Sequence, residues 1–411
     1  MKFKSDFLNE IKARGFIYQD IDIENLDNII LKNKISGYIG FDITSDSLHV
    51  GSLIQLMLLH WFEFYGHQSI ALVGGGTTLI GDPSGKDKTR KILTKNQIDK
   101  NINNIEKTFS KFINLNNSLI INNYDWLSNL NYIDFLREFG SKITLNKMLT
   151  FDSVKSRLDR EQPLTILEFN YMLLQAYDFL HLNKNYNCIL QMGGSDQWGN
   201  ILSGVDLIKK INNKNAFGIT SPLITNNDGS KMGKTADGAV WLNRDKISSL
   251  DFFQFWRNVN DNDVSKFLYL FTKLPLKEIE KLSTLRDKEI NEAKKILAYE
   301  VTKLVRGKQD ADEALEITNN IFNSNIIDER LPNISEKKLN LEDGIFTIVD
   351  AIEKLELVKS RSEIKRLIKS NGIKVNDKLY NYSNLSLKEF AELSEIKITV
   401  GKKKIGILKI T

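Results

Sequence analysis

Two short segments of the chain carry residue types suited to phosphate chemistry. They are LHVGS at residues 48–52 and KMGKT at residues 231–235. His49 and Gly51 stand where a helix is expected to begin, and the amides and dipole of a helix N-terminus attract anions. Lys231 and Lys234 are compact charges on flexible stems that can follow a phosphate through a reaction. Either segment alone is more often structural, but together they predict the two sides of one triphosphate site.

A glycine-rich run at residues 74–86 invites comparison with a P-loop. In its ending, GDPSGK, Gly81 lies one residue too close to Lys86, and Asp87 stands where a P-loop needs Ser or Thr. We therefore reject a Walker motif. The glycines instead permit tight packing and the close approach of a ligand after a strand. Lys86 and Arg90 add positive charge to this loop, and plain surface exposure is an equal alternative for them.

Polar residues also accompany two other predicted elements. Tyr171, Gln175 and Asp178 are spaced at i, i+4 and i+7, which aligns them on one face of a helix. This stripe is either a solvated face or the wall of a pocket for a small polar ligand. Further along, GGSDQW at 193–198 follows a predicted strand and supplies Asp196 and Gln197 at its carboxyl end.

The first half of the chain alternates strand and helix patterns that would position these residues. We expect strands at 36–41, 70–74 and 188–192 and a helix over 48–64. Such alternation predicts an α/β fold, with a parallel sheet covered by helices on both faces. In sheets of this kind ligands bind beyond the carboxyl ends of the strands, and the polar segments lie there.

The second half of the chain lacks this alternation. From 249 to 323 only amphipathic helices are expected, and 331–343, with a proline and several charges, is typical of a linker. A helix–turn–helix-like stretch at 347–370 and several short strands follow. We therefore predict four segments: a ligand-binding α/β domain at 1–248, a helical domain at 249–330, a linker at 331–346 and a small domain at 347–411.

Composition limits the class of protein. A chain of 411 residues exceeds one ordinary core, and its 41% hydrophobic and 27% charged residues are typical of globular proteins. No apolar run approaches the roughly 18 residues that span a bilayer. Cys188 is the only cysteine, which excludes an internal disulfide and a cysteine zinc site. The start of the chain lacks the apolar segment of a signal peptide, so we expect a cytoplasmic protein without a membrane partner.

Charge is concentrated near the end of the chain. Residues 344–411 carry 14 Lys/Arg and 8 Asp/Glu, although the whole chain has a net charge of only +5. A small basic module beside a nearly neutral body indicates a polyanionic partner, most often a nucleic acid. A solubilising tail is the alternative.

Five blocks of the chain, taken in order, resemble those of bacterial-type tyrosyl-tRNA synthetases, a family of class I aminoacyl-tRNA synthetases. The blocks are HVGS at 49–52, GDPSGK at 81–86, YMLLQAYD at 171–178, GGSDQWGN at 193–200 and KMGKT at 231–235. The first and last resemble the family's His-Ile-Gly-His and Lys-Met-Ser-Lys-Ser motifs. The resemblance covers nearly the whole chain. It implies a Rossmann-like catalytic domain, a helical domain on the anticodon side of the tRNA, and a small α+β RNA-binding domain, working as a homodimer.

The resemblance also implies a two-step reaction, that of a tyrosine–tRNA ligase. Tyrosine attacks the α-phosphate of ATP to give tyrosyl-adenylate and pyrophosphate, and the tyrosyl group then passes to the 3′ end of tRNA(Tyr). ATP is a substrate and Mg²⁺ accompanies it, whereas no protein-bound metal is expected. Catalysis then depends on orientation and on charge stabilisation in the transition state rather than on a general base.

Residue roles follow from the resemblance by position. The residues implied for tyrosine are Tyr38 and Asp178 at the phenol, Asp82, Tyr171 and Gln175 at the ammonium, and Gln197, which also lines the adenylate site. Those implied for ATP and the adenylate are Gly40, Asp42, His49, Gly51, Ser52, Gly194, Asp196, Lys231 and Lys234. Those implied for catalysis at the phosphates are Thr44, His49, Lys86, Arg90, Lys231, Lys234 and Thr235.

Three departures from the family pattern are visible. Ser52 replaces the second His of the first motif, and Gly233 and Thr235 replace the two serines of the last, as is common in tyrosine-specific members. Ile39 stands where relatives often carry Cys, so a sugar contact made there by a thiol is absent.

Three rival functions remain to be weighed. A tryptophanyl-tRNA synthetase would share the fold but is expected to lack the pair Tyr38 and Asp178 and the basic C-terminal module. A synthetase-like regulatory protein without catalysis is expected to have lost one of the motif residues, which are all present. A generic ATP-binding protein would leave the basic module unexplained.

Overall fold

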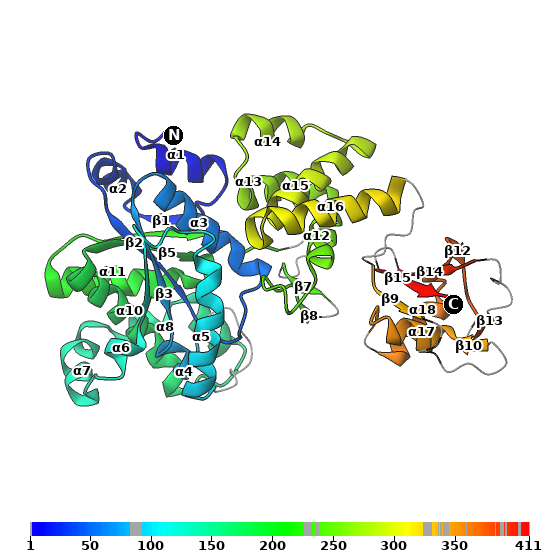
Figure 1. Ribbon diagram of the computed structural model, residues 1–411. Helices are drawn as coiled ribbons and strands as arrows, with labels where there is room; N and C mark the ends of the chain where they lie inside the picture. Colours follow the sequence, from blue (N-terminus) through cyan, green and yellow to red (C-terminus); the bar gives the residue numbers. More distant parts are fainter. Residues whose placement is uncertain are drawn as a thin grey trace. The chain divides into compact units, whose positions relative to one another are not determined.

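The computed structural model forms two compact units, Met1–Lys308 and Gln309–Thr411 (Figure 1). The residues that the structure describes are 2–82, 93–225, 232–235, 238–323, 331–335, 337, 339, 345–358, 360–382, 384–386, 390, 393–401 and 404–410. Within these ranges, no helix is long and apolar enough to cross a membrane.

A six-stranded sheet forms the centre of the first unit, with strand order β1-β6-β5-β2-β3-β4. Its strands are β1 (Gln19–Ile21), β2 (Ser36–Phe41), β3 (Gln68–Val73), β4 (Leu119–Asn122), β5 (Cys188–Gly194) and β6 (Phe217–Ser221). Neighbours from β6 to β4 run parallel, as predicted, whereas the short edge strand β1 is antiparallel to β6. The three predicted strands are confirmed, with ends shifted by up to two residues in β3 and β5.

Helices cover both faces of this sheet. Because successive residues of a strand point to opposite faces, neighbouring residues contact different helices. On one face Tyr38 and Leu72 pack against the long helix α10 (Ile166–Tyr186) in one core cluster. On the other face α3 (Leu53–Phe64) lies so close to β2 that a Cβ on Gly37 would come within 2.9 Å of the Phe62 ring. The glycine therefore permits this contact, and the expected helix over 48–64 is confirmed from Val50 onward.

The remaining helices of the sheet region are short, apart from α5 and α11. They are α1 (Asp6–Ala13), α2 (Ile23–Ile30), η1 (Val50–Ser52), α4 (Thr77–Ile80), α5 (Lys95–Phe109), α6 (Tyr124–Leu127), α7 (Tyr132–Glu138), η2 (Gly140–Lys142), α8 (Leu145–Leu149), α9 (Asp152–Asp159), η3 (Ser195–Gln197) and α11 (Trp198–Asn212). A capping box of Thr165 and Glu168 begins α10, and left-handed Asn187 ends it just before β5. The polar stripe of α10 is thereby held beside the sheet.

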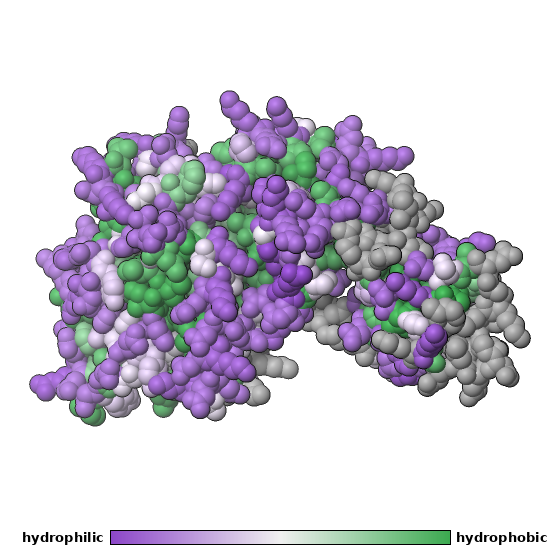
Figure 2. Space-filling model, viewed as in Figure 1, coloured by the Kyte–Doolittle hydropathy of each residue, from purple (hydrophilic) through white to green (hydrophobic). Residues whose placement is uncertain are grey.

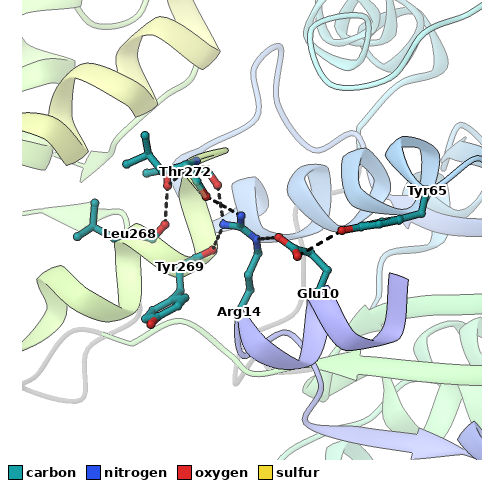
Figure 3. Close-up of polar contacts among 7 residues, drawn as sticks. Glu10, Arg14, Tyr65, Leu268, Tyr269 and Thr272 are labelled. Carbon is teal, nitrogen blue, oxygen red and sulfur yellow. Dashed lines mark hydrogen bonds and ion pairs between the residues drawn. The ribbon is translucent and has the colours of Figure 1, made fainter. Parts of the chain in front are cut away.

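A helical bundle follows the sheet, as predicted, and packs against it. It consists of α12 (Ser249–Arg257), α13 (Asp261–Phe271), α14 (Leu276–Ser283), η4 (Asp287–Glu289) and α15 (Ile290–Arg306). Figure 3 shows how Arg14, the C-cap residue of α1, ties the two parts together. Its guanidinium pairs with Glu10 at 2.7 Å and donates to the carbonyls of Tyr269 and Thr272 at the end of α13. Because Arg14 is only 3% exposed, this contact buries a charge that Glu10 compensates.

The second unit has its own core and a five-stranded sheet of order β12-β11-β14-β15-β9. Its elements are α16 (Lys308–Asn323), β9 (Asn333–Ser335), β10 (Ile345–Thr347), α17 (Ile348–Lys354), α18 (Arg361–Lys369), β11 (Ile373–Val375), β12 (Lys378–Leu379), β13 (Asn384–Ser386), β14 (Glu395–Val400) and β15 (Lys404–Lys409). Two helices packed on a small sheet agree with the expected α+β module. Residues 333–335 of the expected linker form β9, which pairs in parallel with β15.

Candidate active site

A cavity of about 310 Å³ lies at the carboxyl ends of the central strands. Residues that end or follow β2, β3, β5 and β6 line it, including Asp42, Gly74, Gly194 and Pro222. The strand order changes direction between β2 and β5, and ligands of open α/β sheets bind at such a switch point. A cavity therefore lies where the sequence predicted the site.

One wall of the cavity contains a buried carboxyl group. Asp178 on α10 is 1% exposed, and its two oxygens accept bonds from Asn123 Nδ2 at 2.9 Å and Trp126 Nε1 at 2.7 Å. Burial raises the pKa of Asp178 to about 7, although these two hydrogen bonds favour the ionised form and lower it. A buried carboxylate held in this orientation is a strong hydrogen-bond acceptor.

A buried tyrosine hydroxyl lines the same cavity. Tyr38 on β2 is 1% exposed, and within the described part of the chain its Oη has no hydrogen-bond partner. Burial, and then the charge of Asp178, raise the pKa of this phenol well above its usual value, so it stays protonated. A buried hydroxyl without a partner costs free energy unless a ligand satisfies it. Together, Asp178 and Tyr38 offer one acceptor and one donor to a ligand hydroxyl.

A second polar group combines carboxylate and amide oxygens. Gln197 Nε2 donates to Asp82 Oδ2 at 2.8 Å, and Gln175 Nε2 donates to Gln197 Oε1 at 3.2 Å. Asn200 Nδ2 donates to Gln175 Oε1 at 2.8 Å and thereby fixes that side chain. Asp82 is 7% exposed, so its charge acts in a largely desolvated place. Such a group suits an ammonium, which is a compact cation with three donors.

Asp42 joins the sheet to the polar stripe of α10. Its Oδ1 accepts a bond from Tyr171 Oη at 3.1 Å and another from Thr77 Oγ1 at 3.0 Å. Thr77 Oγ1 in turn accepts from Asn123 Nδ2 at 3.0 Å. One continuous hydrogen-bond chain therefore runs from Asp178 through Asn123 and Thr77 to Asp42.

The first motif begins the helix at the rim of the cavity. His49 is the cap of η1, and its Nδ1 accepts from the Gly51 amide at 3.0 Å. In a neutral imidazole the proton then resides on Nε2, which can donate to an anion. A Cβ on Gly51 would come within 2.7 Å of the imidazole, so this arrangement requires glycine.

Most of the expected site residues are brought together by the fold. The cavity is lined by Tyr38, Gly40, Asp42, Gly51, Ser52, Asp82, Tyr171, Gln175, Asp178, Gly194, Asp196 and Gln197. Thr44 and His49 do not line it. Lys86, Arg90 and Lys231 lie outside the described residues, and Lys234 and Thr235 are described only as the strand β7 (Lys234–Thr235), paired with β8 (Gly238–Ala239). In the described ranges no three His, Cys, Asp or Glu side chains gather as a metal site.

Three residues of the site escaped the sequence analysis, namely Thr77, Asn123 and Trp126. Asn123 directly follows β4 and Trp126 lies in the next helix, α6, and the sequence did not predict this strand. The available signal was the short apolar run LII at 119–121, which is followed directly by the two asparagines at 122 and 123. Thr77 lies in the glycine-rich run after β3, where the sequence predicted a role for the glycines but none for Thr77.

Comparison with known proteins agrees with this geometry. The family model described as tRNA synthetases class I (W and Y) matches residues 31–323. A tyrosine–tRNA ligase from Pelagibacter ubique is 51% identical over 403 residues, covering 97% of this chain and 98% of the relative. Another from Orientia tsutsugamushi is 49% identical, covering 98% and 99%.

Solved structures of tyrosyl-tRNA synthetases are similar to this chain as well. A C-terminally truncated mitochondrial tyrosyl-tRNA synthetase from Aspergillus nidulans superposes with a TM-score of 0.70 at 30% identity, covering 78% of this chain and 94% of that structure. An Archaeoglobus fulgidus tyrosyl-tRNA synthetase complexed with L-tyrosine superposes with a TM-score of 0.56 at 15% identity, which bears on the fold alone. The chain therefore belongs to the class I tRNA synthetases and, within them, to the tyrosine–tRNA ligases.

Proposed function

We propose that the tyrosine–tRNA ligase reaction of this chain takes place in the cavity at the carboxyl ends of β2 and β5. The substrate phenol would bind between Tyr38 and Asp178. The observation that carries this proposal is the buried Tyr38 hydroxyl, which has no partner in the described structure and lines the same cavity as the buried carboxyl of Asp178. A phenol can accept from one and donate to the other.

The other end of the substrate would lie at the amide and carboxylate group. Asp82 and the carbonyl oxygens of Gln175 and Gln197 offer acceptors to the ammonium, and Tyr171 lies beside them on α10. The nucleotide would bind along Gly40, Asp42 and Gly194, which follow or end the central strands. The triphosphate would extend toward His49, Lys231 and Lys234. Mg²⁺ would be carried in by ATP, bound to its oxygens.

The chemistry needs no general base. A carboxylate oxygen of tyrosine forms a bond to the α-phosphorus of ATP, and the bond from that phosphorus to the pyrophosphate oxygen breaks. A ribose hydroxyl at the 3′ end of tRNA then attacks the carbonyl carbon, the bond from that carbon to the phosphate oxygen breaks, and the hydroxyl proton passes to the phosphate of the departing AMP. The role of the protein is to align the reactants and to meet negative charge as it develops on the phosphates.

Discrimination against phenylalanine follows from the same pair of residues. Phenylalanine would leave the Tyr38 hydroxyl without a partner and would bury the Asp178 carboxylate against an apolar ring edge. Both penalties arise only for the wrong substrate.

Amino-acid-dependent ATP–pyrophosphate exchange with each of the twenty amino acids tests the proposal. We expect exchange with tyrosine alone and its loss in Asp178→Ala. Exchange with tryptophan but not tyrosine, or unchanged tyrosine kinetics in Asp178→Ala, would contradict it.

We also propose that the second unit binds tRNA. Its helix α18 exposes Lys365, Arg366 and Lys369, whereas Arg361 on the same helix is paired with Asp350. Exposed lysine and arginine side chains on one helix suit a phosphate backbone. Replacing the three by Glu should raise the KM for tRNA and make that KM less dependent on salt concentration, with pyrophosphate exchange unchanged. Normal aminoacylation by the triple variant would refute this role.

A homodimer is the proposed assembly. Figure 2 shows hydrophobic patches on an otherwise hydrophilic surface. Seven of the large apolar side chains that are exposed in the described structure fall in one stretch of the chain, between residues 132 and 167. They are Tyr132, Ile133, Leu145, Leu149, Leu158, Ile166 and Leu167. Such a concentration is typical of a subunit interface. Light scattering should show that the parent protein is a dimer and that the double variant Ile133→Glu/Ile166→Glu is a monomer. A monomeric parent would refute the assembly.

A cytoplasmic location stays a prediction of the sequence.

A further inference from the structure

The segment that follows the KMGKT loop connects three parts of the first unit. We call residues 240–247 the strap. It begins directly after β8 and ends before α12, so it joins the phosphate loop to the helical bundle. Its residues do not line the cavity, and the reaction described above assigns them no role.

The strap holds both candidate phosphate motifs together. The Val50 amide donates to the Val240 carbonyl at 2.9 Å, and the Leu242 amide donates to the Leu48 carbonyl at 2.8 Å. On the other motif, the Val240 amide donates to the Gly233 carbonyl at 2.8 Å. A shift of the strap would therefore move the first motif and the KMGKT loop relative to one another.

His49 has a direct neighbour on the strap. It lies opposite Trp241 in an antiparallel bridge, and the two rings are 6.3 Å apart in an edge-to-face arrangement. Because carbonyls alternate in direction along an extended chain, the Trp241 carbonyl points away from His49. That carbonyl needs a donor from the other side.

Arg306 supplies this donor. It is the last residue of α15, and its Nη2 donates to the Trp241 carbonyl at 3.1 Å while Nη1 donates to the Ile247 carbonyl at 3.2 Å. Its guanidinium lies 4.8 Å from the centre of the Phe252 ring on α12. One planar group thus spans both ends of the strap, which the single ammonium of a lysine cannot do.

Further contacts hold the rest of the strap. Lys246 pairs with Asp46 at 2.7 Å, and the Asn243 amide donates to Ser47 Oγ at 3.2 Å. These contacts lie on the side of residues 46–50. Arg306 contributes a contact from the helical bundle to both ends of the strap, so it helps to set the position of the strap with respect to α15.

We propose that Arg306 is a positioning residue for the ATP-dependent step, acting through the strap on His49 and on the KMGKT loop. This inference rests on the proposed function. The tyrosine subsite is built on β2, α10 and η3, none of which contributes to the strap. Loss of Arg306 therefore affects ATP and the transition state but leaves tyrosine binding intact.

Arg306→Ala is the direct test, with tyrosine Kd, the ATP parameters of pyrophosphate exchange and Tm measured on each variant. We expect kcat/KM for ATP to fall about 10-fold or more, since small displacements of phosphate-binding groups are costly. The tyrosine Kd stays at the parent value. Arg306→Lys should lose less, because its ammonium can still reach one carbonyl.

Two controls separate positioning from stability. Lys303→Ala removes an exposed cation one turn earlier on α15 and should match the parent. Arg14→Ala removes the other arginine that joins the bundle to the sheet, and it should lower Tm without an ATP-selective loss. In a Lys234→Ala background the penalty of Arg306→Ala should shrink, since the loop it positions is already impaired.

Several results would overturn the inference. These are parent-like ATP parameters in Arg306→Ala, an equal loss in tyrosine affinity, or a profile that matches Arg14→Ala. If Arg306→Ala does not fold, Arg306→Lys decides in the same way, and parent-like ATP parameters in that variant would overturn it. Absence of tyrosine-dependent exchange in the parent enzyme would instead refute the proposed function.

Discussion

Tyrosine should bind the free enzyme more weakly as the pH falls, because the carboxyl group that accepts its phenol titrates near neutrality. Burial raises the pKa of Asp178 to about 7. If only the ionised form accepts the phenol, the competent fraction falls from about three quarters at pH 7.5 to about 3% at pH 5.5. This corresponds to a loss of affinity of about 25-fold, or ~2 kcal/mol.

Phenylalanine provides the internal control, since it shares the ammonium and carboxylate of tyrosine but has no phenol. Isothermal titration calorimetry without ATP gives both Kd values at each pH. The ratio of the tyrosine to the phenylalanine affinity should fall about 25-fold from pH 7.5 to pH 5.5 in the parent enzyme. In Asp178→Asn the ratio should be low and independent of pH. A constant ratio in the parent would show that the protonated carboxyl serves equally well and would refute the reasoning.

Three further predictions concern the surroundings of the site. Trp126→Phe removes a donor to a charged acceptor, so tyrosine affinity should fall by about 1.5–3 kcal/mol and the pH midpoint should rise, as the same titrations would reveal. Because the pKa of Asp178 is raised in the folded state, the parent enzyme loses stability as the pH rises from about 4 to about 7. Asp178→Asn lacks this loss, so the difference in Tm between Asp178→Asn and the parent should increase between pH 5 and pH 8. A difference in Tm that stays constant in calorimetry would contradict this. Gly233→Ala should raise the KM for ATP in pyrophosphate exchange without changing tyrosine Kd, because φ at Gly233 is +83° and a Cβ there would come within 2.5 Å of Val50 Cγ2; parent-like exchange would rule that strain out.

The strand pattern and the motif order predicted the fold class, a parallel sheet covered by helices. Buried apolar runs such as 36–41 are readable because a central parallel strand is apolar on both faces. The two edge strands, β1 and β4, were not predicted, because short edge strands have little hydrophobic pattern. Their absence from the prediction also concealed Asn123 and Trp126, which follow β4.

The environment of the site residues could not be predicted in the same way. Spacing placed Asp178 on the stripe of α10, but its pKa depends on burial and on two donors from a segment far away in the sequence. The pairing of residues 48–50 with 240–242 is likewise a contact between distant segments. Such contacts depend on the packed fold rather than on any local pattern, which is why the role of Arg306 emerged only from the structure.

A crystal structure of the enzyme with bound tyrosine tests the central claim most directly. It should place the phenol oxygen within hydrogen-bonding distance of both Tyr38 Oη and a carboxylate oxygen of Asp178, with the ammonium at Asp82. A phenol bound away from this pair, or an ammonium at Asp178, would contradict the account.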